Sequence, residues 1–456
     1  MKSQRLFSFL LILLDAATVV LAFNLVAWAR DLAGPGEWIV ATLQLPVLVH
    51  FLGVYLIDGY SSRTDMMSVT YASQHIIALV GVLLVTLMLT YVFVPPGFSL
   101  QTSRLVTVIS YLAIIPVSLG YRRFAYGRRH GGDEPRYFLF VGTPESCLEF
   151  KEECRRHQMR QAVLFATPET FVRGAPARAG VSAPPFGDVV NYLEEYRGQI
   201  DAIIVRESSH ELPADVAQRL VEMNFSGVPT YTLELFHQVF WRKIPLYRLN
   251  QSWLFQEGFQ IAREPVFERL KRISDVVFSV LGLALFLPLL PFLALAIWAT
   301  DRGPVFFRQT RVGRNRVLFD VYKLRTMRVA AEGDVYTREG DARITPIGRL
   351  LRATRLDEFP QLLNVLRGEM SLIGPRAEWV KLVERYEREI PCYHFRHLVK
   401  PGITGWAQVN YPYGANLDDT MRKLEYDLYY IRFFSFVLDA SIVLKTVHVM
   451  LFGKGR

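Results

Sequence analysis

Cysteine is scarce in this chain, with only three among its 456 residues. Cys147, Cys154 and Cys392 form no CxxC pair and no Cys/His cluster with the spacing of a metal site. We therefore expect neither a disulfide framework nor a zinc site. Unpaired cysteines are typical of a reducing compartment, so the parts of the chain that carry chemistry are expected to face the cytoplasm.

Acidic residues are also in the minority, and this deficit bears on the partners of the chain. There are 43 Asp and Glu against 52 Lys and Arg, which gives a formal net charge of +9. Such a charge suits an anionic membrane surface and anionic substrates as well as nucleic acid. However, 51% of the residues are hydrophobic, and they gather in long uncharged runs. We therefore predict a membrane protein of two or three folding units, without a nucleic-acid partner.

Four apolar runs predict a four-helix transmembrane domain over residues 1–130, each run close to the ~20 residues that cross a bilayer. They cover residues 6–29, 38–57, 74–94 and 105–121. No small-residue cleavage site follows the first run, so we expect a span there rather than a signal peptide. Basic residues before the first run and after the fourth place both ends of this domain in the cytoplasm. Asp15, inside the first run, is either a functional intramembrane acid or a partner for groups within the bundle.

Residues 135–250 predict a small α/β domain, because short apolar runs alternate there with polar helical ones. We expect buried parallel strands at 137–141 and 202–205. Helices are expected at 145–157, 187–197 and 213–224. A dinucleotide-binding fold would carry GxGxxG after its first strand, whereas this chain has Gly142-Thr-Pro-Glu-Ser. We therefore interpret this part as a degenerate Rossmann-like domain with a structural, assembly or regulatory role.

The remaining residues, 262–456, predict a mostly helical domain that begins with an uncharged stretch at 276–300. Pro288 and Pro291 interrupt this stretch, and basic residues flank both of its ends. These features predict a re-entrant helical hairpin that returns to the side it entered from. The alternative is a proline-kinked crossing helix. The tail 433–452 is apolar on one face but carries charges, which predicts a helix lying in the membrane interface.

Two adjacent acids, Asp357 and Glu358, form the candidate site of this domain. Asp is a favoured N-cap and Pro360 fits a first helical turn, so we expect the pair at the N-terminus of the helix that follows. Two carboxylates suit a divalent cation, and arginines suit phosphate oxygens, so the set predicts phosphoryl chemistry. The bracketing arginines are Arg352, Arg355 and Arg376. Upstream, an extended pair of segments presents cations for lipid headgroups or substrate phosphate, namely Arg308, Lys323 and Arg325.

Several long motifs in this order resemble the bacterial sugar transferases, which are monotopic polyprenyl-phosphate phosphoglycosyl transferases. The resemblance covers Pro265 to the C-terminus and rests on Gly303–Phe306, Tyr322–Met327, Leu356–Arg376 and Lys400–Asn410. Leu287-Pro288 matches the break of the family's re-entrant helix, where Ser-Pro is common. In layout, the front part is similar to the long members, which carry four membrane helices and a degenerate nucleotide-binding-like domain.

The resemblance implies transfer of a sugar 1-phosphate from a UDP-sugar to undecaprenyl phosphate, with release of UMP. This reaction would initiate exopolysaccharide or O-antigen synthesis at the cytoplasmic face of the bacterial inner membrane. By matching position, Asp357 would be the nucleophile that forms a phosphosugar intermediate, and Glu358 would ligate Mg2+ beside it. The matching phosphate-binding set is Arg352, Arg376 and Arg396, and Asp427 matches a further acid of the active site. Lys323 is a further candidate for binding substrate phosphate.

Two other functions compete with this one. A membrane nucleotide-sugar dehydratase or epimerase would need GxGxxG and a Tyr-xxx-Lys pair, and the chain has neither. A non-catalytic membrane scaffold or sensor of polysaccharide assembly would not need the acid pair with its arginines. The front half is a candidate surface for a homodimer.

Overall fold

The computed structural model describes most of the chain between residues 2 and 452. The described residues are 2–32, 38–40, 43–61, 64, 66–67, 69–93, 104–130, 137–157, 159, 161–167, 187–196, 198–206, 212–246, 265–328, 341, 343–411 and 416–452. The chain divides into two compact units, Met1–Gly132 with Gln260–Arg456, and Asp133–Phe259. The second unit contains the predicted α/β domain, whereas the division of the first into a membrane and a catalytic domain stays a prediction.

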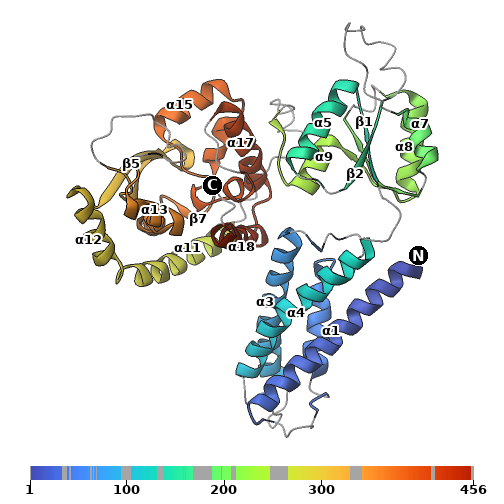
Figure 1. Cartoon of the computed structure of the whole chain (residues 1–456), viewed down its shortest axis with the longest axis horizontal. Coiled ribbons are helices and arrows are strands. Elements are labelled where there is room, and N and C mark those ends of the chain that lie inside the picture. The colour runs from blue at the N-terminus through green and yellow to red at the C-terminus, as the bar shows by residue number, and fades with distance from the viewer. Residues whose placement is uncertain are drawn as a thin grey trace. The chain divides into compact units, whose positions relative to one another are not determined.

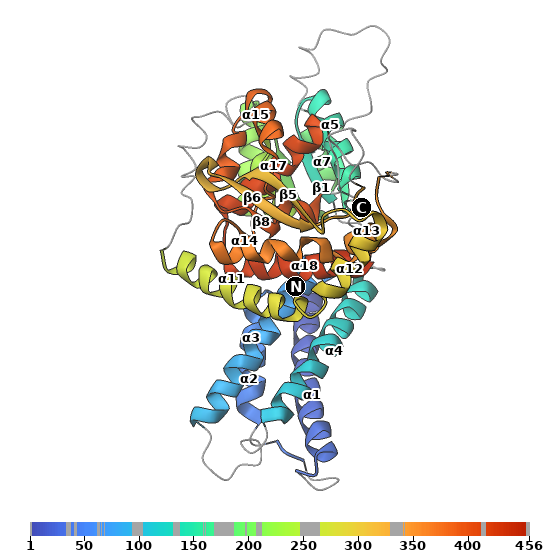
Figure 2. The ribbon, with the colours of Figure 1, turned by 90° about the vertical axis from the view of Figure 1, so that its left-hand side faces the viewer.

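Four helices form the front part of the chain. Their bounds are α1 (Lys2–Ala29), α2 (Gln44–Leu56), α3 (Val69–Phe93) and α4 (Arg104–His130). Helix α1 packs against α2 and α4, and α3 packs against the same two helices (Figure 2). Apolar side chains such as Val19, Phe23 and Leu79 fill the space between them. The expected four helices are therefore present.

The second helix is shorter than the sequence predicted. Helices α1, α3 and α4 are long and apolar enough to cross a membrane, as predicted. Helix α2 has only 13 residues, about 20 Å of helix, where the apolar run at 38–57 predicted a full span. Three of the four predicted spans thus have helices of the required length and composition, whereas the described residues 38–40 at the start of the second run are not helical.

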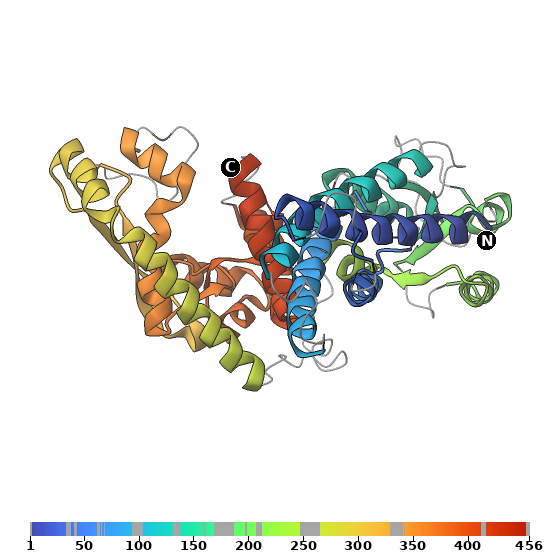
Figure 3. The ribbon, with the colours of Figure 1, turned by 90° about the horizontal axis from the view of Figure 1, so that it is seen from below.

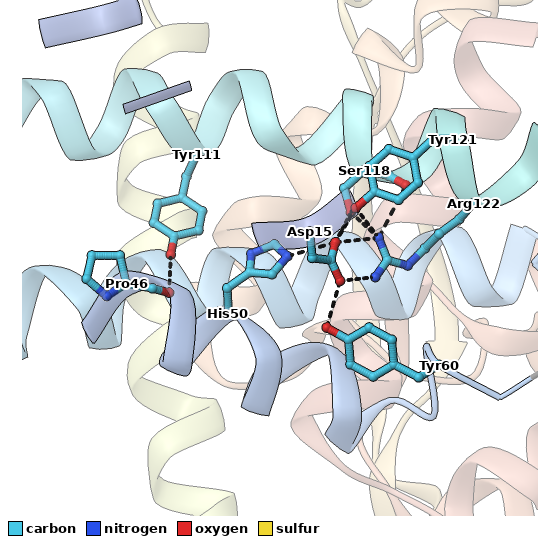
Figure 4. Close-up of polar contacts among 8 residues, drawn as sticks. All are labelled: Asp15, Pro46, His50, Tyr60, Tyr111, Ser118, Tyr121 and Arg122. Carbon is cyan, nitrogen blue, oxygen red and sulfur yellow. Dashed lines mark hydrogen bonds and ion pairs between the residues drawn. The ribbon is translucent and has the colours of Figure 1, made fainter. Parts of the chain in front are cut away.

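Asp15 is the centre of a buried polar cluster inside the bundle (Figure 4). Its side chain has no exposed area, and Arg122 of α4 donates a 2.9 Å hydrogen bond to its Oδ1. The Tyr60 hydroxyl donates to Oδ2 at 2.6 Å, the Tyr121 hydroxyl donates to Oδ1, and His50 Nε2 lies 3.2 Å from Oδ1. Of the two interpretations left open for Asp15, the structure supports the second, in which Asp15 is a partner for other side chains of the bundle.

The α/β unit is a three-layer sandwich around a parallel sheet (Figure 1). Its strands are β1 (Tyr137–Val141), β2 (Ala162–Ala166), β3 (Ile200–Val205) and β4 (Thr230–Thr232), in the order β2-β1-β3-β4. Alternate β1 residues face opposite layers, as the two-residue period of a strand requires. Leu139 and Val141 pack with α7 (Val189–Glu195) and α8 (Ala214–Phe225). Phe138 and Phe140 pack with α5 (Pro144–Arg156) and α9 (Leu233–Phe236).

This unit confirms the predicted parallel sheet and its two buried strands. Two strands were not predicted, namely β2, which lies at the sheet edge and is only partly buried, and β4, which has three residues. The π-helix η2 (His237–Trp241) that follows α9 was not predicted either.

The C-terminal part begins with two apolar helices that meet at a sharp bend. Helix α11 (Pro265–Phe286) and helix α12 (Leu290–Asp301) are inclined at 63° to each other (Figure 3). Pro288 lies in the break and Pro291 in the first turn of α12, where each removes a backbone donor. Large apolar side chains such as Leu285, Phe292 and Leu295 point outward, at 76%, 73% and 63% exposure.

Short strands and helices follow this pair and build the rest of the C-terminal part. They are β5 (Phe306–Val312), β6 (Leu318–Leu324), α13 (Pro346–Thr354), η5 (Leu356–Gln361), α14 (Leu362–Arg367), β7 (Ser371–Ile373), α15 (Val380–Glu389), η6 (Tyr393–Leu398), β8 (Gly402–Thr404), α16 (Trp406–Asn410), α17 (Leu417–Arg432) and α18 (Phe436–Phe452). Strands β5 and β6 form the predicted extended pair, which is antiparallel, and β7 pairs in parallel with β8. This part is mostly helical, as predicted.

The charges of α18 point into the protein. Asp439 forms an ion pair with Lys271 of α11 and accepts a 2.8 Å hydrogen bond from the Tyr430 hydroxyl. Lys445 donates to Asn410 at 2.8 Å and lies over the ring of Trp406. Val437, Val443, Val447 and Met450 remain about half exposed. The polar side of α18 is thus occupied by the protein itself, and an apolar side is left outward.

Candidate active site

The two acids lie in the 3-10 helix η5, between α13 and α14. Arg355 has a φ of 58° and ends α13, so the chain turns sharply just before the acids. The expectation that Asp357 caps a helix N-terminus is wrong, because Gln361 precedes α14 and neither helix start has a side-chain cap. Sequence could not separate a short 3-10 helix from the first turn of the helix behind it, because both suit Asp and Pro in the same places.

An apolar contact holds η5 against the bent helix pair. The ring of Phe359 stacks on Phe286, the last residue of α11, with ring centroids 5.2 Å apart. Leu324 of β6 and Leu351 of α13 complete this cluster, and both are fully buried. Packing on α11, β6 and α13 therefore fixes η5, the segment that carries the acids.

Glu358 is a buried carboxylate that is compensated by cations. Lys323 of β6 donates to its Oε1 at 2.7 Å, and guanidinium nitrogens of Arg355 and Arg376 lie 3.8 Å from its oxygens. Burial raises the pKa of Glu358, but Lys323 and Arg376 outweigh burial and hold this pKa at about 2. Glu358 is therefore ionised at neutral pH.

Asp357 differs from its neighbour, because its buried Oδ1 has no hydrogen-bond partner among the described residues. Burial raises the pKa of Asp357 above its ordinary value, and the negative charge of Glu358 raises it further. Lys323, Arg352 and Arg355 act in the opposite direction. Native proteins satisfy nearly all buried polar atoms, so a partnerless carboxylate oxygen among cations marks a place prepared for a ligand.

The arginines predicted for phosphate binding fall into two groups. Arg376 lies beside Glu358, its side chain 39% exposed, and Arg352 donates through Nε to the Thr326 hydroxyl at 3.0 Å. Arg396 is instead buried, and its guanidinium donates to Asp427 Oδ2 at 2.9 Å. The structure thus brings Asp357, Glu358, Lys323, Arg352 and Arg376 together, and it pairs Arg396 with Asp427.

Two further cations of the strand pair are engaged elsewhere. Arg308 pairs with Asp320 on the neighbouring strand, and Arg325 donates a 2.6 Å hydrogen bond to Asp301 at the end of α12. Of the three cations that the strand pair was expected to present, Lys323 contacts the acid pair, whereas Arg308 pairs with Asp320 and Arg325 binds the end of the helix pair.

Sequence reasoning missed several residues around this site. Glu378 lies 3.8 Å from the partly buried Arg311 and 4.0 Å from the buried Arg396, so it places a carboxylate between two cations. Tyr393 accepts a hydrogen bond from Arg396, and Phe359 anchors η5. The only signal for Glu378 was its place just after Gly374-Pro-Arg376, and the aromatic residues gave none.

The acid pair fits a Mg2+ ion. Among the described residues, no group of three or more His, Cys, Asp and Glu could form a protein cage for a metal. Mg2+ does not need one, because it is usually held by one or two carboxylates together with waters and substrate phosphates. The Asp357 carboxylate and the ionised Glu358 are ligands of that kind.

Comparison with known proteins places this region in one family. The family model described as bacterial sugar transferase matches residues 266–453. The chain is 42% identical over 186 residues to the exopolysaccharide production protein PSS of Rhizobium leguminosarum bv. phaseoli, which covers 39% of this chain and 93% of that protein.

Two longer relatives match over a smaller share of their own length. A UDP-N-acetylgalactosamine-undecaprenyl-phosphate N-acetylgalactosaminephosphotransferase of Aeromonas hydrophila is 37% identical over 257 residues, 56% of this chain and 60% of the relative. A UDP-glucose:undecaprenyl-phosphate glucose-1-phosphate transferase of Escherichia coli (strain K12) is 45% identical over 182 residues, 39% of each chain. The chain belongs to the bacterial sugar transferase family.

Proposed function

We propose that this protein transfers a sugar 1-phosphate from a UDP-sugar to undecaprenyl phosphate, through a phosphosugar intermediate on Asp357. The observation that carries the proposal is the asymmetry of the acid pair. Glu358 is ionised and held by Lys323, whereas Asp357 has a carboxylate oxygen without a partner. The names of the Aeromonas and Escherichia relatives support the donor and acceptor classes.

The reaction proceeds in two displacements. Asp357 Oδ1 attacks the phosphorus that bears the sugar, the bond from that phosphorus to the bridging oxygen breaks, and UMP leaves with the electron pair. A phosphate oxygen of undecaprenyl phosphate then attacks the same phosphorus, and the Asp357 carboxylate leaves. Carboxylates act as nucleophiles in covalent catalysis, and the covalent intermediate splits one difficult transfer into two easier ones.

The cations around the acids make the attack feasible. A pyrophosphate repels an anionic nucleophile, and positive charge near its oxygens lowers that barrier. Lys323, Arg352 and Arg376 are the residues that would hold the phosphates. Mg2+, held by Asp357 and Glu358, would supply Lewis-acid neutralisation of the same oxygens when bound.

The bent helix pair supports a re-entrant hairpin. In the first half of α11, ahead of the uncharged stretch at 276–300, Arg272 donates to the carbonyl of Leu366 at 2.6 Å, and Asp275 accepts from the amide of Leu372 at 3.0 Å. At the far end, Asp301 of α12 binds Arg325. A helix that crosses the bilayer has its ends on opposite sides, whereas both ends of this pair bind the same compact part of the chain.

This geometry suits an acceptor that stays in the membrane. The exposed apolar side of the hairpin would enter the bilayer, and the Phe286–Phe359 contact would keep the acids at its surface. We place the site on the cytoplasmic face of the bacterial inner membrane, because basic residues flank both ends of the hairpin.

The decisive experiment is UMP release from purified protein given Mg2+, undecaprenyl phosphate and a panel of UDP-sugars. The account predicts UMP release with at least one donor, and none from Asp357→Asn. Asp418→Asn is the matched control, because Asp418 is a 61% exposed aspartate outside the site. A non-catalytic scaffold would release no UMP with any donor.

A further inference from the structure

Arg396 and Asp427 differ in exposure from the residues that a substrate can reach. The side chain of Arg396 is 6% exposed and that of Asp427 is 2% exposed, whereas that of Arg376 is 39% exposed. A cation that binds a diffusing pyrophosphate has to meet it, and Arg376 can do so. Arg396 and Asp427 are enclosed by protein.

The guanidinium of Arg396 has partners in α17, in the segment after β7 and in its own helix η6. One terminal nitrogen donates to Asp427 Oδ2 of α17 at 2.9 Å and to the main-chain carbonyl of Arg376 at 3.0 Å. The other donates to the hydroxyl of Tyr393 within η6. Arg396 therefore joins α17 and η6 to the segment that follows β7.

The same segment is fixed on its other side by β8. The amide of Gly374 donates to Thr404, and the amide of Gly402 donates to the carbonyl of Pro375, both at 2.9 Å. The approach is close, since a Cβ on Gly402 would lie 2.1 Å from the Gly374 nitrogen. With Arg396 on one side and β8 on the other, the main chain at Arg376 has little freedom.

We propose that Arg396 and Asp427 are positioning residues that act through the main chain of Arg376, rather than ligands of the substrate phosphates. The proposal rests on the proposed function. The Arg396–Asp427 pair holds the Arg376 carbonyl, and the Arg376 side chain then lies 3.8 Å from Glu358, where it faces the phosphates.

The charge balance of the pair supports this role. A buried guanidinium needs a buried counter-ion, and removal of one partner leaves the other uncompensated. Asp427 supplies that charge, with Glu378 at 4.0 Å from Arg396 as a second acid. Because the charge of Arg396 is compensated by the protein itself, it contributes less to binding an anion than the exposed Arg376 does.

The test is a double-mutant cycle in the full-length enzyme, with UMP release as the readout. Asp427→Asn should lower kcat about 100-fold, the effect of a small misplacement of a catalytic group, with the KM for the UDP-sugar almost unchanged. In an Arg376→Lys background, Asp427→Asn should lower kcat by less than about 5-fold, because the guanidinium that Asp427 helps to position is already absent. Independent losses that multiply, with a raised KM in both backgrounds, would show that the pair binds substrate directly.

Hydrogen exchange without substrate gives a second readout that needs no activity. Amides of residues 371–378 should exchange faster in Asp427→Asn and in Arg396→Lys than in the native protein. The matched control is Arg385→Lys, at an exposed arginine that pairs with Glu389 on α15. Unchanged exchange in both variants would overturn the positioning role, and native protein that releases no UMP with any donor would overturn the proposed function instead.

Discussion

Two buried aspartates, one in the front bundle and one in the C-terminal part, show how differently a protein can treat the same group. Asp15 has no exposed area and is contacted by Arg122, Tyr60, Tyr121 and His50. Asp357 is also buried, but its Oδ1 has no partner among the described residues. Burial alone therefore does not identify a functional acid.

The difference lies in which groups satisfy the charge. The partners of Asp15 come from the bundle itself, so its charge stabilises the contact of α1 with α4. The cations near Asp357 are arranged around Glu358 instead, so one oxygen of Asp357 is left for a ligand. The Rhizobium relative is matched over 93% of its own length by 39% of this chain, so that relative is far shorter than this chain.

The largest effect is expected from Asp357→Asn. The amide has almost the same shape but is a far weaker nucleophile, so UMP release should fall on the order of 10⁴-fold or more. The midpoint temperature of thermal unfolding should be unchanged or slightly higher, because a buried charge is removed. UMP release within 10-fold of the native rate would contradict the distinction between the two aspartates.

The reverse pattern is expected from Asp15→Ala. This change leaves Arg122 buried without its counter-ion and should lower the free energy of unfolding by about 3–5 kcal/mol. Replacement of both partners by leucine should recover much of the loss. Thermal unfolding of detergent-solubilised protein measures both. The kcat of the protein that remains folded should stay within a few-fold of native, and a loss like that of Asp357→Asn would make Asp15 part of the chemistry.

Lys323→Met tests the compensation of Glu358. Loss of the 2.7 Å contact leaves Glu358 under-compensated and removes a cation from the phosphates, so kcat/KM should fall about 100- to 1,000-fold. Arg308→Met is the control on the neighbouring strand, since Arg308 is 66% exposed and pairs with Asp320. Equal losses in the two variants would mean that general positive charge, rather than the Lys323–Glu358 contact, supports the reaction.

Asp427 offers a smaller test, because it is intermediate between the two aspartates. It has an arginine partner, but its Oδ1 has none among the described residues, and burial raises its pKa to about 6 despite Arg396. A raised acid pKa favours the protonated form in the folded state. This stabilisation is full below the ordinary pKa of about 3.9 and is lost as the pH rises through about 6.

The stability of Asp427→Asn relative to native protein should therefore increase by about 2–3 kcal/mol between pH 4 and pH 7, because the amide does not titrate. Denaturant unfolding at several pH values measures this difference. A difference that stays constant with pH would show that Asp427 keeps an ordinary pKa in the folded protein.

Local patterns predicted most of the elements and the pair of acids. The parallel sheet, the β5–β6 pair and the break at Pro288 follow from periodicity and from proline chemistry, which act over a few residues. The helix expected to fill the run at 38–57 was too long, because an apolar run does not fix where a helix begins or ends. Helix α2 is shorter than its run, whereas α4 extends beyond its run at 105–121.

The internal order of the site could not be predicted, because it depends on contacts between distant residues. Glu358 meets Lys323 across 35 positions, and Arg396 meets Asp427 across 31. The family resemblance predicted that Arg376 and Arg396 both bind phosphate. In the structure, the side chain of Arg376 is 39% exposed, whereas that of Arg396 is 6% exposed. Sequence identifies which charged residues gather in this region, and the fold decides which of them a substrate can reach.

The central claim is tested most directly by intact-protein and peptide mass spectrometry after incubation with UDP-sugar and Mg2+ in the absence of undecaprenyl phosphate. The account predicts an added sugar phosphate on a peptide containing Asp357, and its loss when undecaprenyl phosphate is supplied. An active enzyme that carries the adduct on another residue, or that releases UMP only when the acceptor is present and never carries an adduct, would contradict it.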